Sequence, residues 1–168
     1  MRSTSRSVRP IAKHELPLLQ ARSPRPLRLH RDRWALQQAG KALYLISWQR
    51  KVLAGHVLLE WPNTSDLVIA PRVAACPNLS AFWVAAPLRS QGIGTSMLAT
   101  VARIVQQRGY RQIGLAVATD NVRARVLYER EGFCDSGLGT FTLHRTQIDA
   151  DGRALLQEEQ CVYLTKRL

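Results

Sequence analysis

The stretch Arg89-Ser90-Gln91-Gly92-Ile93-Gly94-Thr95 lies between a strand-like segment and a helix-like segment. Upstream, residues 79–84 are apolar, aromatic and β-branched, which is typical of a buried strand. Downstream, apolar residues recur at helical spacing up to Gly109, which we expect to end the helix. Amides in the first turn of a helix lack intrahelical partners and lie at its positive end. The order strand, glycine loop, helix therefore predicts a site for a phosphorylated ligand, with Gly92 and Gly94 allowing close approach of the backbone.

A second strand and helix are predicted after this helix. In residues 112–118, the larger side chains fall on one face, and Gly114, Ala116 and Ala118 fall on the other. The small face indicates that something lies close to it. Asp120 is the expected N-cap of a helix over 121–131, which Gly132 ends.

The flanking segments predict antiparallel strands and short helices. Strands are expected over 7–11, 42–48, 52–60, 140–148 and 160–166, and helices over 14–20 and 29–39, whereas 66–78 is ambiguous. Residues 49–51 are expected to form a hairpin turn. Strand, helix, strand, helix in the middle of the chain indicates a parallel βαβ unit. The predicted fold class is α/β, with a mixed sheet and helices on both of its faces.

Composition indicates one domain of 168 residues with a formal net charge of +12. No apolar run is long enough to cross a bilayer and no signal peptide is visible, so we expect a cytoplasmic protein. Three cysteines at wide spacings, Cys76, Cys134 and Cys161, match neither a disulfide framework nor a zinc site. We expect them to be reduced core residues, and we expect no metal.

The positive charge is concentrated near the N-terminus, where residues 1–33 contain nine Lys or Arg against Glu15 and Asp32. Such a segment binds RNA or another acidic partner, or is a solvated basic surface. The second interpretation is favoured, because no aromatic residues alternate with these arginines as a stacking platform requires.

Two sequence blocks together resemble the Gcn5-related N-acetyltransferase (GNAT) family. In the first, Arg89, Gly92 and Gly94 fit the family's coenzyme loop. In the second, residues 121–133 resemble the following helix, with Asn121, Ala124, then Leu-Tyr, then Gly-Phe. The resemblance covers 42–133 and implies a GNAT fold, with a six- or seven-stranded sheet and splayed middle strands. Residues 1–41 would form an acceptor-side lobe and 134–168 a C-terminal strand pair of a single domain, 1–168.

The resemblance implies that acetyl-coenzyme A binds between the middle strands. Its diphosphate would lie on the amides of residues 91–95, with side-chain contacts from Arg89 or Gln91. Its pantetheine arm would lie against the main chain near Trp83 and Val84 and beside the small face of 112–118. The cofactor-binding residues are therefore expected to be Trp83, Val84, Arg89, Ser90, Gln91, Gly92, Ile93, Gly94, Thr95 and Asn121.

The resemblance also implies direct acetyl transfer to a primary amine of a small molecule or peptide. Tyr128 is the expected acid that protonates the departing sulfur, although a packed aromatic is the alternative interpretation. An amide near Val84 is the expected oxyanion donor. Glu60 is the first candidate for the base, with His56 and Asp66 as alternatives. Deprotonation at pH 7 costs about 4.6 kcal/mol for a lysine and about 1.1 kcal/mol for an α-amine, which favours an α-amine.

The residues on the acceptor side have two interpretations. Trp34, Tyr44, Trp48 and Trp61, with nearby arginines, indicate either a cleft for an acidic or aromatic amine or packing of the first lobe. Packing is favoured for Tyr44 and Trp48. The alternative functions are a toxin-like enzyme that acetylates aminoacyl-tRNA, a non-catalytic nucleic-acid-binding or regulatory module, and an acyl-coenzyme A sensor. We expect a monomer or homodimer with no membrane partner.

Overall fold

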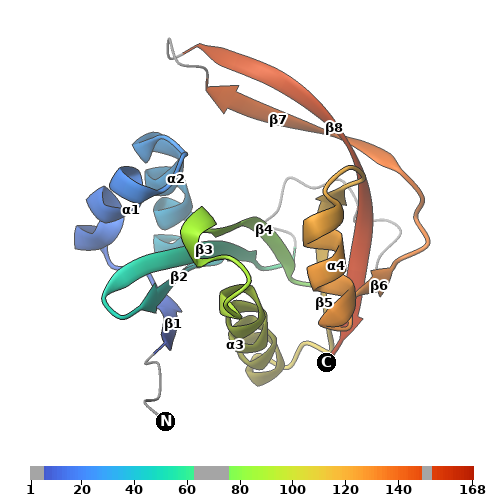
Figure 1. Ribbon diagram of the computed structural model, residues 1–168. Coiled ribbons are helices and arrows are strands. Elements are labelled where there is room, and N and C mark those ends of the chain that lie inside the picture. Colours follow the sequence, from blue (N-terminus) through green and yellow to red (C-terminus); the bar gives the residue numbers. More distant parts are fainter. Residues whose placement is uncertain (1–5, 63–75, 149–152) are drawn as a thin grey trace.

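The computed structural model describes residues 6–62, 76–148 and 153–168, and the segment 66–78, which was ambiguous in the sequence, lies mostly outside them (Figure 1). In chain order the elements are β1 (Arg6–Pro10), η1 (Lys13–Glu15), α1 (Leu16–Arg22), α2 (Leu27–Gln38), β2 (Ala42–Gln49), β3 (Val52–Glu60), β4 (Asn78–Val84), η2 (Ala86–Leu88), α3 (Ile93–Gln107), β5 (Gln112–Ala118), α4 (Val122–Arg130), β6 (Cys134–Asp135), β7 (Phe141–Ile148) and β8 (Ala154–Arg167). The predicted strands and helices are therefore present, with shifted ends.

The strands form one mixed sheet. Its order is β1-β2-β3-β4-β5-β8-β6, and β7 pairs with β8 off this path. Strands β4 and β5 run parallel with α3 between them in the chain, so the predicted βαβ unit is confirmed. The described residues form eight strands rather than six or seven, because β8 is long enough to pair with both the two-residue β6 and the eight-residue β7.

The two parallel strands separate along their length. Within the described residues, β4 and β5 pair only where Asn78 lies opposite Gly114 and Leu79 opposite Leu115. The register between β3 and β4 shifts between His56 and Leu58, and Ala81 has a φ of 51°. A bulge of this kind bends its strand. The expected splay of the middle strands is therefore present.

Both faces of the sheet are buried by helices. Helix α3 places Ile93, Met97, Val101 and other residues of its apolar stripe against one face. On the other face, α1 and α2 pack against β2 and β3, for example through Leu19 and Ile46. The prediction of helices on both faces is confirmed.

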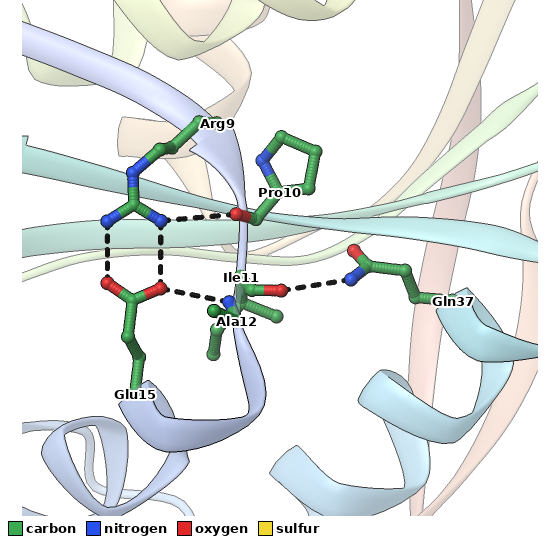
Figure 2. A network of polar contacts seen from close by, with 6 residues as sticks. All are labelled: Arg9, Pro10, Ile11, Ala12, Glu15 and Gln37. Atoms are coloured by element: carbon green, nitrogen blue, oxygen red, sulfur yellow. Dashed lines mark hydrogen bonds and ion pairs between the residues drawn. The ribbon is translucent and has the colours of Figure 1, made fainter.

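A polar network fixes the α1–α2 lobe to the first strand (Figure 2). Arg9 forms two hydrogen bonds to the buried carboxylate of Glu15, at 2.8 and 2.6 Å, and the amide of Ala12 donates to the same group at 2.9 Å. The bond from Arg9 holds the pKa of Glu15 below its usual value. Gln37 of α2 donates to the carbonyl of Ile11 at 3.0 Å. The lobe therefore has a defined position on the sheet.

In the described part of the chain, no helix is both long and apolar enough to span a bilayer.

Candidate active site

A pocket of about 650 Å³ lies where β4 and β5 separate. Its walls come from these strands, the start of α4, the α2 side of the first lobe, and the β7–β8 hairpin, which curves toward that lobe in Figure 1. Five residues that the sequence offered for catalysis or cofactor binding line it: His56, Glu60, Trp83, Asn121 and Tyr128. Three arginines that the sequence did not single out also line it: Arg25, Arg33 and Arg145.

The loop before α3 has the backbone geometry of a helix N-terminus open to a ligand. Gly92 is the N-cap residue of α3, with a left-handed φ of 77°, and Ser90 has a φ of 62°. The amide of Ser96 donates to the carbonyl of Gly92 at 3.0 Å. The amides of Ile93, Gly94 and Thr95 precede that bond, so they lie ahead of the helical hydrogen-bond ladder.

Side chains of the loop brace it against its neighbours. Arg89 donates through Nε to the carbonyl of Val84 at 3.1 Å, and Gln91 donates to the carbonyl of Pro87 at 3.2 Å. Arg123 of α4 donates to the hydroxyl of Ser90 at 3.1 Å. These bonds connect the loop to its own main chain and to α4. Arg123 was missed at the sequence level, although its place two residues after Asn121, on the exposed first turn, was a usable signal.

The first turn of α3 is also tied to the end of α4. Thr95 donates its hydroxyl to Glu131 at 2.7 Å, and Arg130 donates to the same hydroxyl at 3.3 Å. A Cβ on Gly94 would lie 2.9 Å from Leu127. A larger residue at position 94 would therefore push the end of the Leu127 side chain aside, so Gly94 lets α3 and α4 pack closely.

The small face of β5 has two different explanations. A Cβ on Gly114 would overlap the phenol of Tyr163, so that position is small because of the protein's own side chain. The expectation that the space at Gly114 serves a ligand is wrong. Ala116 and Ala118 line the pocket and leave room there.

Tyr128 lies in the pocket wall with its ring packed edge-on against Phe82 and Phe133, at centroid distances of 5.9 and 5.8 Å. Tyr128 as a whole is 7% exposed to solvent. Burial raises the pKa of Tyr128 to about 12, opposed by the charge of Arg145. The phenol is therefore protonated throughout the neutral range, and it is a weaker acid than an exposed tyrosine.

Glu60 lies at the end of β3 and is held by its neighbours on β4. Its carboxylate accepts hydrogen bonds from Ser80 at 2.7 Å and from Asn78 at 3.2 Å. The side-chain oxygen of Asn78 accepts in turn from Tyr163 at 3.2 Å. The carboxylate therefore has a defined orientation at the edge of the pocket.

His56 is a weak base despite its place in the pocket lining. Its Nδ1 donates to the carbonyl of Ala81 at 2.9 Å, and its Nε2 lies 3.4 Å from the hydroxyl of Ser23. Burial, with the charge of Arg33 next in size, lowers the pKa of His56 to about 3. Its ring stacks on Trp83 at 5.2 Å. The geometry makes His56 a support for the bulge in β4. Asp66, the other alternative base, lies outside the described residues.

Two smaller expectations are corrected. The N-cap of α4 is Asn121 rather than Asp120, because the side-chain oxygen of Asn121 accepts from the amide of Ala124 at 3.2 Å. Its amide group is left as a donor near the pocket. Cys134 is exposed and is not a core residue, whereas Cys161 is buried.

The four aromatic residues considered for an acceptor cleft do not line the pocket. Tyr44 is fully buried, and Trp48 packs partly buried beside it, as expected. Trp61 stacks on Tyr110 at 6.1 Å. Trp34 packs against the core of the first lobe. The pocket's aromatic surface comes instead from Phe82 and Trp83 of β4 and from Tyr128 of α4.

The residues that the structure describes include no group of three or more His, Cys, Asp or Glu that could hold a metal ion.

Comparison with solved structures finds the same fold in several acetyltransferases. The Brucella melitensis ribosomal-protein-alanine N-acetyltransferase matches with a TM-score of 0.69 at 16% identity, over 96% of this chain and 99% of that one. Arabidopsis thaliana Naa50, in complex with the bisubstrate analogue CoA-Ac-MVNAL, matches with a TM-score of 0.70 at 19% identity, over 98% of this chain and 99% of that one. The PaiA N-acetyltransferase of Thermoplasma acidophilum, in complex with coenzyme A, matches with a TM-score of 0.68 at 13% identity, over 98% of this chain and 99% of that one. At these identities the likeness establishes the fold.

Curated protein sequences give no match. The model of the acetyltransferase (GNAT) family, however, matches residues 7–133, which include the loop, both middle strands and α4. The match covers more than half of the chain and agrees with the observed fold. The chain therefore belongs to the acetyltransferase (GNAT) family.

Proposed function

We propose that the protein transfers an acetyl group from acetyl-coenzyme A to a primary amine of a small molecule or peptide by direct attack. The observation that carries the proposal is a pocket between separated parallel strands with the phenol of Tyr128 in its wall. The loop before α3 does not line this pocket, but its Ser90 accepts a hydrogen bond from Arg123, two residues after the pocket-lining Asn121. Membership of the family supports acetyl-coenzyme A as the donor.

The residues of the loop fit a coenzyme diphosphate. The amides from Gln91 to Thr95 would donate to its oxygens, with Gly92 supplying the left-handed turn that exposes them. The cations of Arg89 and Arg123 lie at the same loop and complement its charge.

The pantetheine arm would follow the gap between the strands. In this arrangement the main chain at Trp83 and Val84 binds it from β4. Asn121, whose side-chain oxygen is used by the cap, offers its amide group from the start of α4. Ala116 and Ala118 leave space on the β5 side.

Bound acetyl-coenzyme A supplies a thioester that an amine can attack, with a thiolate as leaving group. Tyr128 carries the proton for that thiolate. Against a thiol pKa of about 8.5, a phenol pKa of about 12 makes the transfer uphill by about 5 kcal/mol. For an ordinary phenol with a pKa of about 10 the transfer would be uphill by only about 2 kcal/mol, and burial increases this cost. The charge of Arg145, which lowers the pKa of Tyr128, acts in the favourable direction.

Glu60 is the proposed base for the attacking amine. Ser80 and Asn78 both donate to Oε2 of its carboxylate, so Oε1 is the oxygen that would take up the proton. An α-amine, with a pKa of about 7.8, loses its proton at a far smaller cost than a lysine. Two of the structural relatives also support an α-amine, because one is described as acting on an alanine of a ribosomal protein and the other is bound to a peptide analogue.

A thiol-release assay tests the proposal. The protein, acetyl-coenzyme A and a panel of amines would be compared: amino acids, short peptides, N-acetyl-lysine amide as a side-chain amine, and a polyamine. Turnover with α-amines above the others is the expected result. Release that does not depend on an added amine, or turnover unchanged in Glu60→Gln over the whole pH range, would contradict the proposed base and acceptor.

A second candidate is a non-catalytic nucleic-acid-binding module on the same fold. It is favoured by the five arginines between residues 22 and 33 and by the net charge of +12. Salt-sensitive binding of RNA without release of thiol from any acceptor would support this candidate over the enzyme.

A further inference from the structure

We propose that the acceptor amine carries a carboxylate, which Arg25 and Arg33 bind at the α2 side of the pocket. This inference rests on the proposed function and names the substrate class of the same site. Both guanidinium-bearing residues line the pocket, together with Leu29 between them in the chain. Arg25 lies in the turn before α2, and Arg33 lies two turns into that helix.

Arg33 is held by the protein on one side. Its Nη1 donates to the hydroxyl of Tyr44 at 3.4 Å, and its guanidinium carbon lies 5.7 Å from the centre of that ring. Tyr44 is fully buried, and its hydroxyl also hydrogen-bonds with Nδ1 of His30 at 2.6 Å. The remaining N–H groups of Arg33 are the donors available to a pocket ligand, and a planar fork of this kind matches a carboxylate.

No carboxylate of the described residues forms an ion pair with Arg25 or Arg33. The other arginine of the pocket, Arg145, is paired with Glu159 at 2.8 Å. The carboxylate of Glu60 is hydrogen-bonded to neutral groups of β4. The α2 side of the pocket therefore has positive charge that no described side chain neutralises.

The half-buried state of Arg33 makes this charge significant, because a partly desolvated cation without a counter-ion is unfavourable until an anion binds beside it. The positive charge of Arg33 also acts on the two histidines near it, His30 and His56. The charge of Arg33 contributes to the lowered pKa of both His30 and His56, so the two histidines stay neutral and do not supply the positive charge themselves.

The pocket thus has a proton acceptor at Glu60 and a carboxylate-binding pair on the α2 side. The carboxylate can belong to a free amino acid or to an acidic side chain in a peptide whose α-amine is acetylated. Both sources share the chemistry that the arginines recognise, and matched probes distinguish them.

The test compares acceptors that differ only in a carboxylate. The thiol-release rate would be measured for Ala-Glu-amide against Ala-Gln-amide, and for free alanine against alaninamide. A kcat/KM at least tenfold higher for one carboxylate-bearing member than for its amide is the expected result. The first pair reports an acidic side chain in a peptide and the second reports the carboxylate of a free amino acid.

Substitutions assign the preference to the two arginines. In Arg25→Gln and in Arg33→Gln, the ratio of kcat/KM between the carboxylate-bearing acceptor and its amide should fall toward one. Arg33→Lys should retain part of this preference. Arg31→Gln is the matched control, because Arg31 is exposed on the same helix and does not line the pocket. Arg25 is itself exposed, so its substitution keeps the test valid if Arg33→Gln fails to fold.

Equal rates within both pairs, or a preference that both glutamine variants retain, would overturn the inference and leave the proposed function intact. Turnover of aminoacyl-tRNA far above every small probe, lost steeply with added salt, would also overturn it, because the ligand would then be a polyanion. By contrast, no thiol release with any amine would contradict the proposed function itself.

Discussion

At the scale of single residues, Tyr128 is the side chain whose surroundings most constrain the chemistry. Its phenol is buried in the pocket wall between two aromatic rings. Tyr128→Phe keeps the ring and removes the proton donor. We expect kcat to fall by about 10²- to 10⁴-fold, with little change in the affinity for acetyl-coenzyme A. Steady-state kinetics and a binding titration measure the two effects separately.

Tyr110→Phe is the matched control for this substitution. Tyr110 stacks on Trp61 and does not line the pocket, so its loss of a hydroxyl should leave kcat unchanged. Unchanged turnover in Tyr128→Phe would show that the tyrosine only packs, which is the alternative that the sequence left open.

From the raised pKa of Tyr128 we predict how the rate depends on pH on the alkaline side. The acid form is the active one, and it persists until the pH approaches about 12 rather than the ordinary value of about 10. The rate should therefore show no decline from this group below about pH 10. A descending limb centred near pH 8.5 that disappears in Tyr128→Phe would contradict the assignment.

Because His30 and His56 are buried, we expect the protein to lose stability in mild acid. Burial lowers their pKa to about 4 and about 3, while in the unfolded chain both titrate near 6.5. As the pH falls below 6.5, the unfolded state takes up protons that the folded state does not. Stability is thus fully present above that value and is lost progressively toward pH 3. At pH 5 the loss is about 2 kcal/mol for each histidine.

Denaturant unfolding at pH 7.5 and pH 5 measures this effect. The decrease in free energy of unfolding should be smaller by about 2 kcal/mol in His56→Gln, whatever the stability of that variant at pH 7.5. His144→Gln is the control, since its side chain is 55% exposed, and it should keep the full decrease. Equal decreases in all three proteins would contradict the buried, neutral state of His56.

At the scale of elements, the proposal places the coenzyme on the loop and the first turn of α3. Gly92 has a left-handed φ of 77° at the start of the helix, and Gly109 has a φ of 82° just beyond its end, with open space around it. Valine at either position meets the same backbone strain of about 1–2 kcal/mol. Only Gly92→Val should also abolish binding of acetyl-coenzyme A, whereas Gly109→Val should bind normally.

A thermal-shift titration compares these two variants, because ligand at 100 times its dissociation constant stabilises a protein by about 2.7 kcal/mol. A normal shift in Gly92→Val, or a loss in both variants, would place the coenzyme elsewhere.

The elements were largely predictable because their signals are local. Periodicity indicated α3, the turn at 49–51 between two strand-like segments indicated the β2–β3 hairpin, and Gly109 ended its helix as expected. The length of β8 was not predictable, because it depends on pairing with strands distant in sequence. The cap of α4 was misassigned by one residue, since Asp120 and Asn121 are both good caps and only the geometry decides between them.

The site was predictable to the extent that its residues fall in the two family blocks. Tyr128, Asn121 and the glycine loop come from those blocks, and Glu60 came from its place at a strand end. Arg25 and Arg33 could not be located, because their position at the pocket depends on how the first lobe packs on the sheet. Gly114 was misinterpreted because Tyr163, which fills its space, is 49 residues away in the sequence.

At the scale of the whole molecule, one polar network and one long strand set the pocket's shape. The network of Arg9, Glu15 and Gln37 fixes the first lobe to the sheet, and β8 carries the hairpin that faces that lobe across the pocket. The proposed donor site and the α2 side of the pocket both lie within the matched region, 7–133, whereas the β7–β8 hairpin lies outside it. The first lobe and this hairpin have the weaker sequence signals. This division explains why the chemistry of acetyl transfer is easier to derive than the identity of the amine.

The central claim is that backbone amides at the start of α3 bind the donor beside the separated strands. Amide hydrogen exchange with and without acetyl-coenzyme A tests it directly. The account predicts new protection confined to residues 91–95 and to the exposed end of β4 near Trp83 and Val84. Binding that protects other segments, and leaves the amides of 91–95 exchanging as in the free protein, would contradict it.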